Sequence, residues 1–223
     1  MWRGDCNGLD IEVDYLTMTE LEQVEMVQQA VIDTLTEGSQ YQSLTTEEFV
    51  KLLTDRTLIG AYYEGRLIAF RALLIPPLDE EHLGYDIGYP LDALDRILYQ
   101  EVTNVLPDYR GYGLQQYLGR LLMKELEHGS RFDLVCATVA PFNIPSLKDK
   151  FALGLRIGAL KPKYGGKLRY IFMKELHSDW EATGDTMWID MGATEQQVAL
   201  LKTGWFGTTM RRDGENWLVK YER

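Results

Sequence analysis

The sequence predicts a mixed α/β fold, with a twisted central sheet, helices on both of its faces and a smaller tryptophan-rich C-terminal extension. Along residues 11–176, apolar residues recur with the two-residue period of strands in some segments and the three-to-four-residue period of helices in others. At residues 97–126 a strand, a glycine turn and an amphipathic helix follow one another directly. With 223 residues and 45% hydrophobic content, the chain is long enough to bury a core without disulfides.

The first elements follow from period and helix caps. Residues 1–10 show no periodicity, so we expect a loosely held arm. A Thr-x-x-Glu pattern marks a helix start, because the two side chains satisfy free backbone N–H groups reciprocally. The expected elements are a strand at 11–16, a helix from Thr17 to Gly38, a short helix from Thr45 to about Asp55, and a hairpin of 57–63 with 66–75.

The junction at residues 105–114 is the strongest local signal. Residues 97–105 are rich in β-branched and aromatic side chains, and Pro107 ends that strand. From Leu114 to Leu126, leucines recur on one helical face. Gly111 and Gly113 therefore sit where strand becomes helix, and there the free N–H groups of the first helical turn attract anions such as phosphate. A plain tight turn is the alternative reading.

The elements after this turn carry a family resemblance. A second apolar strand spans 133–140, a helix opens at Asn143-x-x-Ser146 and ends near Gly154, and a hairpin of 155–160 with 167–176 closes the domain. This order resembles that of the Gcn5-related N-acetyltransferase (GNAT) superfamily over residues 11–176. The resemblance implies the acyl-CoA N-acyltransferase fold, acetyl-CoA as cosubstrate, and no metal.

In this family the phosphate-binding turn has the pattern Q/R-x-x-G-x-G/A. The chain can be aligned with this pattern in two ways, and each alignment departs from it at one position. Starting at Arg110, the last small residue is replaced by Gln115; starting at Asp108, the first position has changed. Backbone amides do most of the phosphate binding, so neither departure removes that chemistry. Lys150 stands where many members have the tyrosine that acts as general acid.

The resemblance also implies where the cofactor and the reacting groups lie. In the family the pantetheine arm inserts between the two central strands, here 97–105 and 134–140. Backbone and side-chain groups at the strand end, the turn and the second helix would hold the cofactor: Val105, Arg110, Gly111, Tyr112, Gly113, Leu114, Gln115, Asn143, Ser146 and Lys148.

Acyl transfer to an amine also requires a proton acceptor and an acid for the leaving thiolate. Glu101 is the candidate base, because it is the one carboxylate in the motif strand and shares the face of Val105; an ordinary surface glutamate is the alternative. Tyr164 is the candidate acid, with Tyr170, Tyr99 or solvent as alternatives.

The charge distribution indicates the acceptor. The net charge is −11, which argues against a nucleic-acid partner. Residues 1–100 carry −13, residues 101–176 carry +5, and residues 177–223 carry −3. We therefore expect an N-acetyltransferase whose acceptor is the primary amine of a small, cationic molecule. The alternatives are an uneven solvated surface and a non-catalytic coenzyme-A-binding sensor or interaction module. A P-loop or dinucleotide site is disfavoured, since its glycine motifs are absent.

Between Leu78 and Arg96 the chain is acidic and turn-rich. We expect a surface excursion with a short helix at about 92–98. The alternative is a functional loop, because the corresponding segment of the family often borders the acceptor pocket. The side chains that would do so are His82, Tyr85, Asp86 and Tyr89.

Residues 177–223 form the predicted extension. They hold four of the five tryptophans, a helix-like stretch at 194–202 and strand-like runs at 204–210 and 217–221. So short a segment rarely folds alone, so we expect Trp180, Trp188, Trp205 and Trp217 to be buried against the main domain or against a second copy in a homodimer. An aromatic substrate cage is the alternative.

Cysteine usage and hydropathy indicate the compartment. Cys6 and Cys136 do not form a disulfide framework, and Cys136 lies in an apolar strand typical of a core. No signal peptide and no membrane-length apolar run is present. The sequence therefore predicts a cytoplasmic protein without a membrane partner.

Overall fold

The structure, a computed structural model, describes residues 1–35, 41, 43–178 and 180–223. It divides into two compact units, residues 1–75 with 100–124 and residues 76–99 with 125–223. The boundary crosses strand β5 (Ile97–Val105) between Tyr99 and Gln100. The predicted division into 11–176 and 177–223 remains a prediction.

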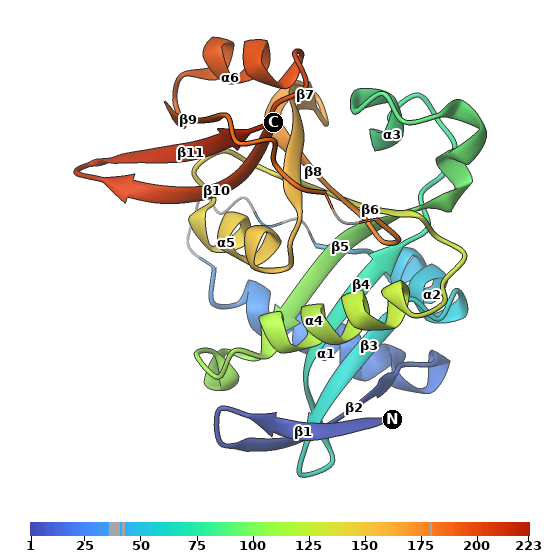
Figure 1. Cartoon of the computed structure of the whole chain (residues 1–223). Helices are drawn as coiled ribbons and strands as arrows, with labels where there is room; N and C mark the ends of the chain where they lie inside the picture. The colour runs from blue at the N-terminus through green and yellow to red at the C-terminus, as the bar shows by residue number, and fades with distance from the viewer. Residues whose placement is uncertain (36–40, 42, 179) are drawn as a thin grey trace. The chain divides into compact units, whose positions relative to one another are not determined.

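The first unit holds the strands in the order β1-β2-β3-β4-β5, with β1 to β4 paired antiparallel. Phe49 of α2 packs edge-on against Phe70 of β4, whereas the next residue, Arg71, points to the opposite face and reaches α4. Helices therefore cover both faces of this part of the sheet, as predicted (Figure 1). The elements are β1 (Trp2–Cys6), β2 (Leu9–Tyr15), α1 (Leu21–Ile32), α2 (Thr46–Thr54), β3 (Leu58–Tyr63), β4 (Arg66–Leu74) and α4 (Leu114–Glu127), whose last residues belong to the second unit.

Two expectations for the first unit need correction. Residues 1–10 are not a loose arm, because Trp2–Cys6 forms a strand paired with β2 through a tight turn. Helix α1 ends at Ile32, short of the expected end at Gly38, which lies outside the described residues. Both predicted capping boxes are present; Thr45 and Glu48 cap α2, and Thr17 and Glu20 cap a 3₁₀ turn that leads into α1.

The second unit continues from the first residues of β5 in the order β5-β6-β8-β7-β10-β11-β9. Strand β5 pairs parallel with β6 from Ile97 to Tyr99, and the later pairs are antiparallel. The elements are α3 (Leu83–Asp86), a 3₁₀ turn (Leu91–Arg96), β6 (Leu134–Val139), α5 (Ile144–Ala152), β7 (Arg156–Lys163), β8 (Lys167–Glu175), β9 (Thr186–Asp190), α6 (Thr194–Leu201), β10 (Phe206–Asp213) and β11 (Asn216–Glu222).

The segment before β5 also departs from expectation. The short helix expected at 92–98 is the 3₁₀ turn at Leu91–Arg96, because Ile97 already pairs with Leu134 in the sheet. Leu94 of this turn and Ile97 of β5 join Leu83 and Cys136 in a core cluster of this unit. Cys136 is fully buried there, in agreement with a core role.

The tryptophans of the C-terminal segment are partly buried within this chain, and their burial against the main domain or a second copy stays a prediction. Each indole ring lies beneath a cationic side chain, which is attracted to the negative face of the ring. The side chains buried beside α6 in this unit include Tyr170 and Tyr221, whose hydroxyls both donate to the buried Gln197 of α6. The stacked pairs are Arg156 with Trp180, Arg211 with Trp188, Arg223 with Trp205 and Lys148 with Trp217.

Candidate functional site

The turn between β5 and α4, in the first unit, has the backbone geometry of an anion site. Gly111 and Gly113 have φ of 88° and 82°, a region that non-glycine residues enter only at a cost of roughly 1–2 kcal/mol. Helix α4 starts directly after them at Leu114, so the N–H groups of its first turn have no partner within the helix. A Cβ built at Gly111 would meet no atom within 4 Å, so the space beside the turn is open to a ligand.

A buried arginine of β4 holds the start of α4 in place. Arg71 of β4 is 1% exposed, and its guanidinium donates to the backbone carbonyl of Gln115 at 3.0 Å and to Oε1 of Gln100 at 2.8 Å. Gln100 in turn lies 3.5 Å from the Met123 sulfur. Charged donors form strong hydrogen bonds in a buried setting, so Arg71 sets the position of the first turn of α4. This role could not be predicted from the sequence, because a lone arginine in an apolar strand belongs to no motif.

The predicted cofactor residues of the first unit contribute differently. Leu114 is buried, so only its backbone remains available, and the side chain of Arg110 donates to Oγ1 of Thr34 at 2.9 Å. Tyr112 is 36% exposed, and Val105 and Gln115 are partly buried. The turn therefore offers mainly backbone N–H groups.

Asn143, Ser146 and Lys148 belong to the second unit, at the start of α5. Oδ1 of Asn143 accepts from the Ser146 backbone N–H at 3.4 Å, so Asn143 is the helix cap. Lys148 is exposed, with its ammonium 5.8 Å from the Trp217 ring centroid. Lys150, at the usual tyrosine position, pairs with Asp149 at 3.2 Å.

Glu101, the candidate base, lies in the first unit on β5. It is exposed, whereas its neighbour Gln100 and the following Asn104 are buried on the opposite face of the strand. Strand alternation therefore places Glu101 on the same side as Val105, as expected from the spacing.

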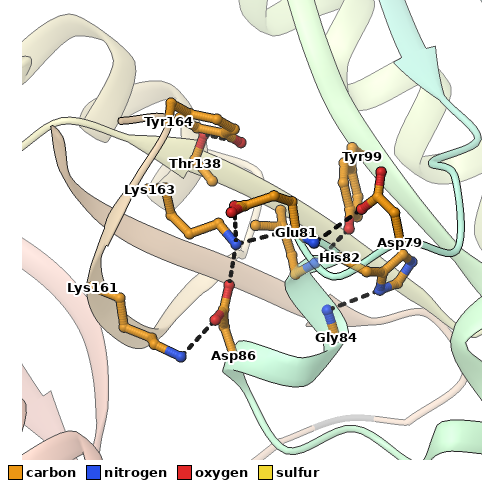
Figure 2. Close-up of polar contacts among 11 residues, drawn as sticks. Asp79, Glu81, His82, Gly84, Asp86, Tyr99, Thr138, Lys161, Lys163 and Tyr164 are labelled. Carbon is orange, nitrogen blue, oxygen red and sulfur yellow. Dashed lines mark hydrogen bonds and ion pairs between the residues drawn. The ribbon is translucent and has the colours of Figure 1, made fainter. Parts of the chain in front are cut away.

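The three candidate acids lie in the second unit and differ in access. Tyr170 is fully buried with its hydroxyl bonded to Gln197, so it cannot reach a substrate. Tyr164 is 47% exposed, and its hydroxyl lies 3.3 Å from Oγ1 of Thr138 (Figure 2). The Tyr99 hydroxyl accepts from the Leu83 backbone N–H at 2.5 Å, and burial raises the pKa of Tyr99, which keeps it protonated. Tyr164 and Tyr99 thus remain candidates.

An ion-pair cluster that the sequence did not predict holds residues 81–86 in the second unit. The buried carboxylate of Asp86 lies 3.0 Å from the Lys163 ammonium and 2.6 Å from that of Lys161 (Figure 2). Lys163 also pairs with the Glu81 carboxylate at 2.9 Å. We call these four residues the Asp86 cluster. Burial alone would lower the pKa of Lys163, but the hydrogen bonds and charges of Glu81 and Asp86 raise it above its usual value.

His82 packs beside this cluster as a neutral side chain. It is 1% exposed, its Nδ1 accepts from the Gly84 backbone N–H at 3.1 Å, and its ring lies 5.5 Å from the Tyr99 ring. Burial lowers the pKa of His82. Among the side chains suggested for a functional loop, His82 and Asp86 are therefore engaged within the protein, whereas Tyr85 is 46% exposed.

Within the described part of the chain, no group of three or more His, Cys, Asp or Glu side chains is arranged to hold a metal ion. Likewise, none of the helices described is both long and apolar enough to cross a membrane.

Comparisons with known proteins identify the fold. No family model matches the sequence, and no curated protein matches it. Among solved structures, the ribosomal-protein-S18-alanine N-acetyltransferase from Escherichia coli is 17% identical, with a TM-score of 0.54 over 77% of this chain and 97% of that chain. The structure of yncA from Salmonella typhimurium with its cofactor acetyl-CoA is 16% identical, with a TM-score of 0.55 over 78% and 98%.

An N-acetyltransferase from Staphylococcus aureus Mu50 is 17% identical, with a TM-score of 0.57 over 74% of this chain and 97% of that chain. Three-quarters of the chain thus matches nearly the whole length of each of these structures. The expected mixed α/β fold is confirmed as that of the GNAT acetyltransferases.

Proposed function

From this GNAT fold we propose that the chain transfers the acetyl group of acetyl-CoA to the primary amine of a small, cationic acceptor. The proposal rests on the turn at Gly111 and Gly113, where both glycines have positive φ and α4 begins directly afterwards. Such a turn supplies backbone N–H donors and a partial positive charge to a diphosphate. Two solved structures of the same fold contain acetyl-CoA or coenzyme A, which supports acetyl-CoA as the cosubstrate.

Acetyl-CoA, the cosubstrate, supplies the acetyl group as a thioester. In the proposed reaction the acceptor nitrogen attacks the thioester carbon, the C–S bond breaks, and the amine loses one proton while the thiolate gains one. Glu101 is the proposed acceptor of the amine proton, since its carboxylate is exposed on β5. Tyr164 is the proposed proton donor to the thiolate, because it is 47% exposed.

The remaining predicted residues take supporting parts in this proposal. Val105 and the turn from Arg110 to Gln115 hold the cofactor mainly through backbone groups, since the Leu114 side chain is buried. Asn143, Ser146 and Lys148 of α5 are proposed to add polar contacts to it.

The charge distribution supports a cationic acceptor. Residues 1–100 carry a net −13, whereas residues 101–176, which include the phosphate turn, carry +5. A negative field raises the local concentration and the association rate of a cation.

One observation favours a second function, that of a non-catalytic coenzyme-A-binding module. Lys150 stands at the usual tyrosine position, and its ammonium is engaged by Asp149 at 3.2 Å, so that position supplies no tyrosine acid. The test measures thiol release from acetyl-CoA with a panel of amines, alongside calorimetric binding. Amine-dependent release supports the transferase, whereas binding without release with any amine supports the module.

A further inference from the structure

The N-terminal hairpin contacts the proposed cofactor turn within the first unit. Strands β1 and β2 pair with Cys6 opposite Leu9, which leaves a two-residue connection of Asn7 and Gly8. Both residues have positive φ, 53° and 91°. This is the geometry of a type I′ turn, for which Asn-Gly is a preferred sequence. The sequence Asn7-Gly8 therefore favours the observed conformation of the hairpin turn.

Two side chains of this tip converge on one carbonyl of the cofactor turn. Nδ2 of Asn7 donates to the backbone oxygen of Tyr112 at 2.9 Å, and the Cys6 thiol donates to the same oxygen at 3.1 Å. The packing is close, because a Cβ built at Gly113 would lie 3.1 Å from Nδ2 of Asn7. At Gly4 of β1, a Cβ would lie against the hydroxyl of Tyr117 in α4.

These contacts determine the direction of one N–H group. The chain contains no cis peptide bond among the described residues, and in a trans peptide the C=O and the N–H point in opposite directions. The Tyr112 carbonyl is held on the hairpin side by two donors. The N–H of Gly113, in the same peptide unit, therefore points away from the hairpin.

We propose that Asn7, assisted by Cys6, is a positioning residue that aims the Gly113 N–H at the diphosphate of coenzyme A. This inference rests on the proposed function, because it concerns how the same turn is oriented for coenzyme A. Asn7 is the stronger of the two, since an amide is a better donor than a thiol. Without it, the Tyr112–Gly113 peptide would be free to rotate between two glycine-permitted orientations, and cofactor binding would have to select one of them.

The test uses two substitutions that retain the hairpin. Asn7→Gly removes the donor, and Asn7→Asp replaces it with a carboxylate facing the Tyr112 carbonyl; Gly-Gly and Asp-Gly both suit the I′ turn. Calorimetry with coenzyme A should give a Kd raised about three- to tenfold for Asn7→Gly, in keeping with one neutral hydrogen bond, and more for Asn7→Asp. The control Asn216→Asp makes the same charge change at an exposed site of the second unit and should leave Kd unchanged.

A spectroscopic readout separates positioning from mere stability. In ¹⁵N-labelled wild-type protein, coenzyme A should move the Gly113 amide proton downfield, and both Asn7 variants should show a smaller displacement with an unchanged melting temperature. Wild type that binds, together with Asn7 variants that match it in Kd and in the Gly113 displacement, overturns the inference and leaves the proposed function standing. Wild type that does not bind coenzyme A overturns the proposed function and this inference together.

Discussion

Two lysines that contact the same carboxylate should differ sharply in their contribution to stability. Lys163 and Lys161 both pair with Asp86, but the Lys163 side chain is 6% exposed and the Lys161 side chain 49%. Deleting the buried Lys163 ammonium leaves the Asp86 carboxylate with only the more exposed Lys161, so we expect a cost of about 3–5 kcal/mol, that of a broken buried ion pair. Removing an exposed partner costs about 0–1 kcal/mol. The perturbations are Lys163→Met and Lys161→Met, which keep the aliphatic stem and delete the ammonium.

Urea unfolding followed by circular dichroism measures both effects. With a slope of about 2 kcal/mol/M, the midpoint should fall by about 1.5–2.5 M for Lys163→Met and by less than about 0.5 M for Lys161→Met. The double variant Lys163→Met with Asp86→Leu should recover part of the loss, because it also removes the buried carboxylate, which in the single variant has only the more exposed Lys161 as a partner. Equal small shifts for the two lysines would refute the reasoning that burial of the Asp86 cluster decides its energy.

The pH dependence has a definite sign. The folded-state pKa of Lys163 is raised above its unfolded value of about 10.4, so its contribution is fully present below that pH and is lost as pH rises through the folded pKa. The stability gap between wild type and Lys163→Met should therefore stay constant from neutral pH to about pH 10 and narrow only above it. A gap that closes between pH 6 and pH 8 would contradict this assignment.

Three further outcomes are expected. Glu101→Gln should lower turnover by about a hundred- to ten-thousand-fold at neutral pH and by less at high pH, where the amine is already deprotonated; an unchanged pH–rate profile would make Glu101 structural. Gly111→Val should weaken coenzyme A binding strongly, whereas Gly65→Val, at a similar φ and with equally open space in the same unit, should not; equal effects would argue against the turn as the site. With a matched pair of amines, efficiency towards the cationic one should fall as salt rises, since exposed charges are screened beyond roughly 8 Å; preference for the neutral amine would remove the electrostatic argument.

The sequence allowed the central part of the fold to be predicted, because its signals are local. The leucine period from Leu114 and the β-rich run from Ile97 give α4 and β5 their observed starts. The N-terminal hairpin is less evident from the sequence although Asn7-Gly8 is a strong turn signal, because the strand Trp2–Cys6 is short and has only Trp2 and Cys6 as apolar residues, too few to establish a period.

The packing of distant side chains was beyond sequence reasoning. Nothing local indicates that Lys163 meets Asp86, or that Arg71 reaches the Gln115 carbonyl, because these contacts depend on how strands far apart in the chain are placed. The tryptophans show the same limit, because aromatic content does not indicate that a cationic side chain lies over each ring. Which residues hold cofactor and acceptor remains a prediction.

Transfer of a labelled acetyl group from acetyl-CoA to an amine distinguishes an acetyltransferase from a protein that only binds the cofactor. Acetyl-CoA deuterated in its acetyl group is incubated with the protein and an equimolar mixture of small cationic and neutral amines, and the products are identified by mass spectrometry. We expect a deuterated N-acetyl product of a cationic amine, formed in step with free coenzyme A and lost in the Gly111→Val variant. Folded protein that binds acetyl-CoA but labels no amine would contradict this expectation.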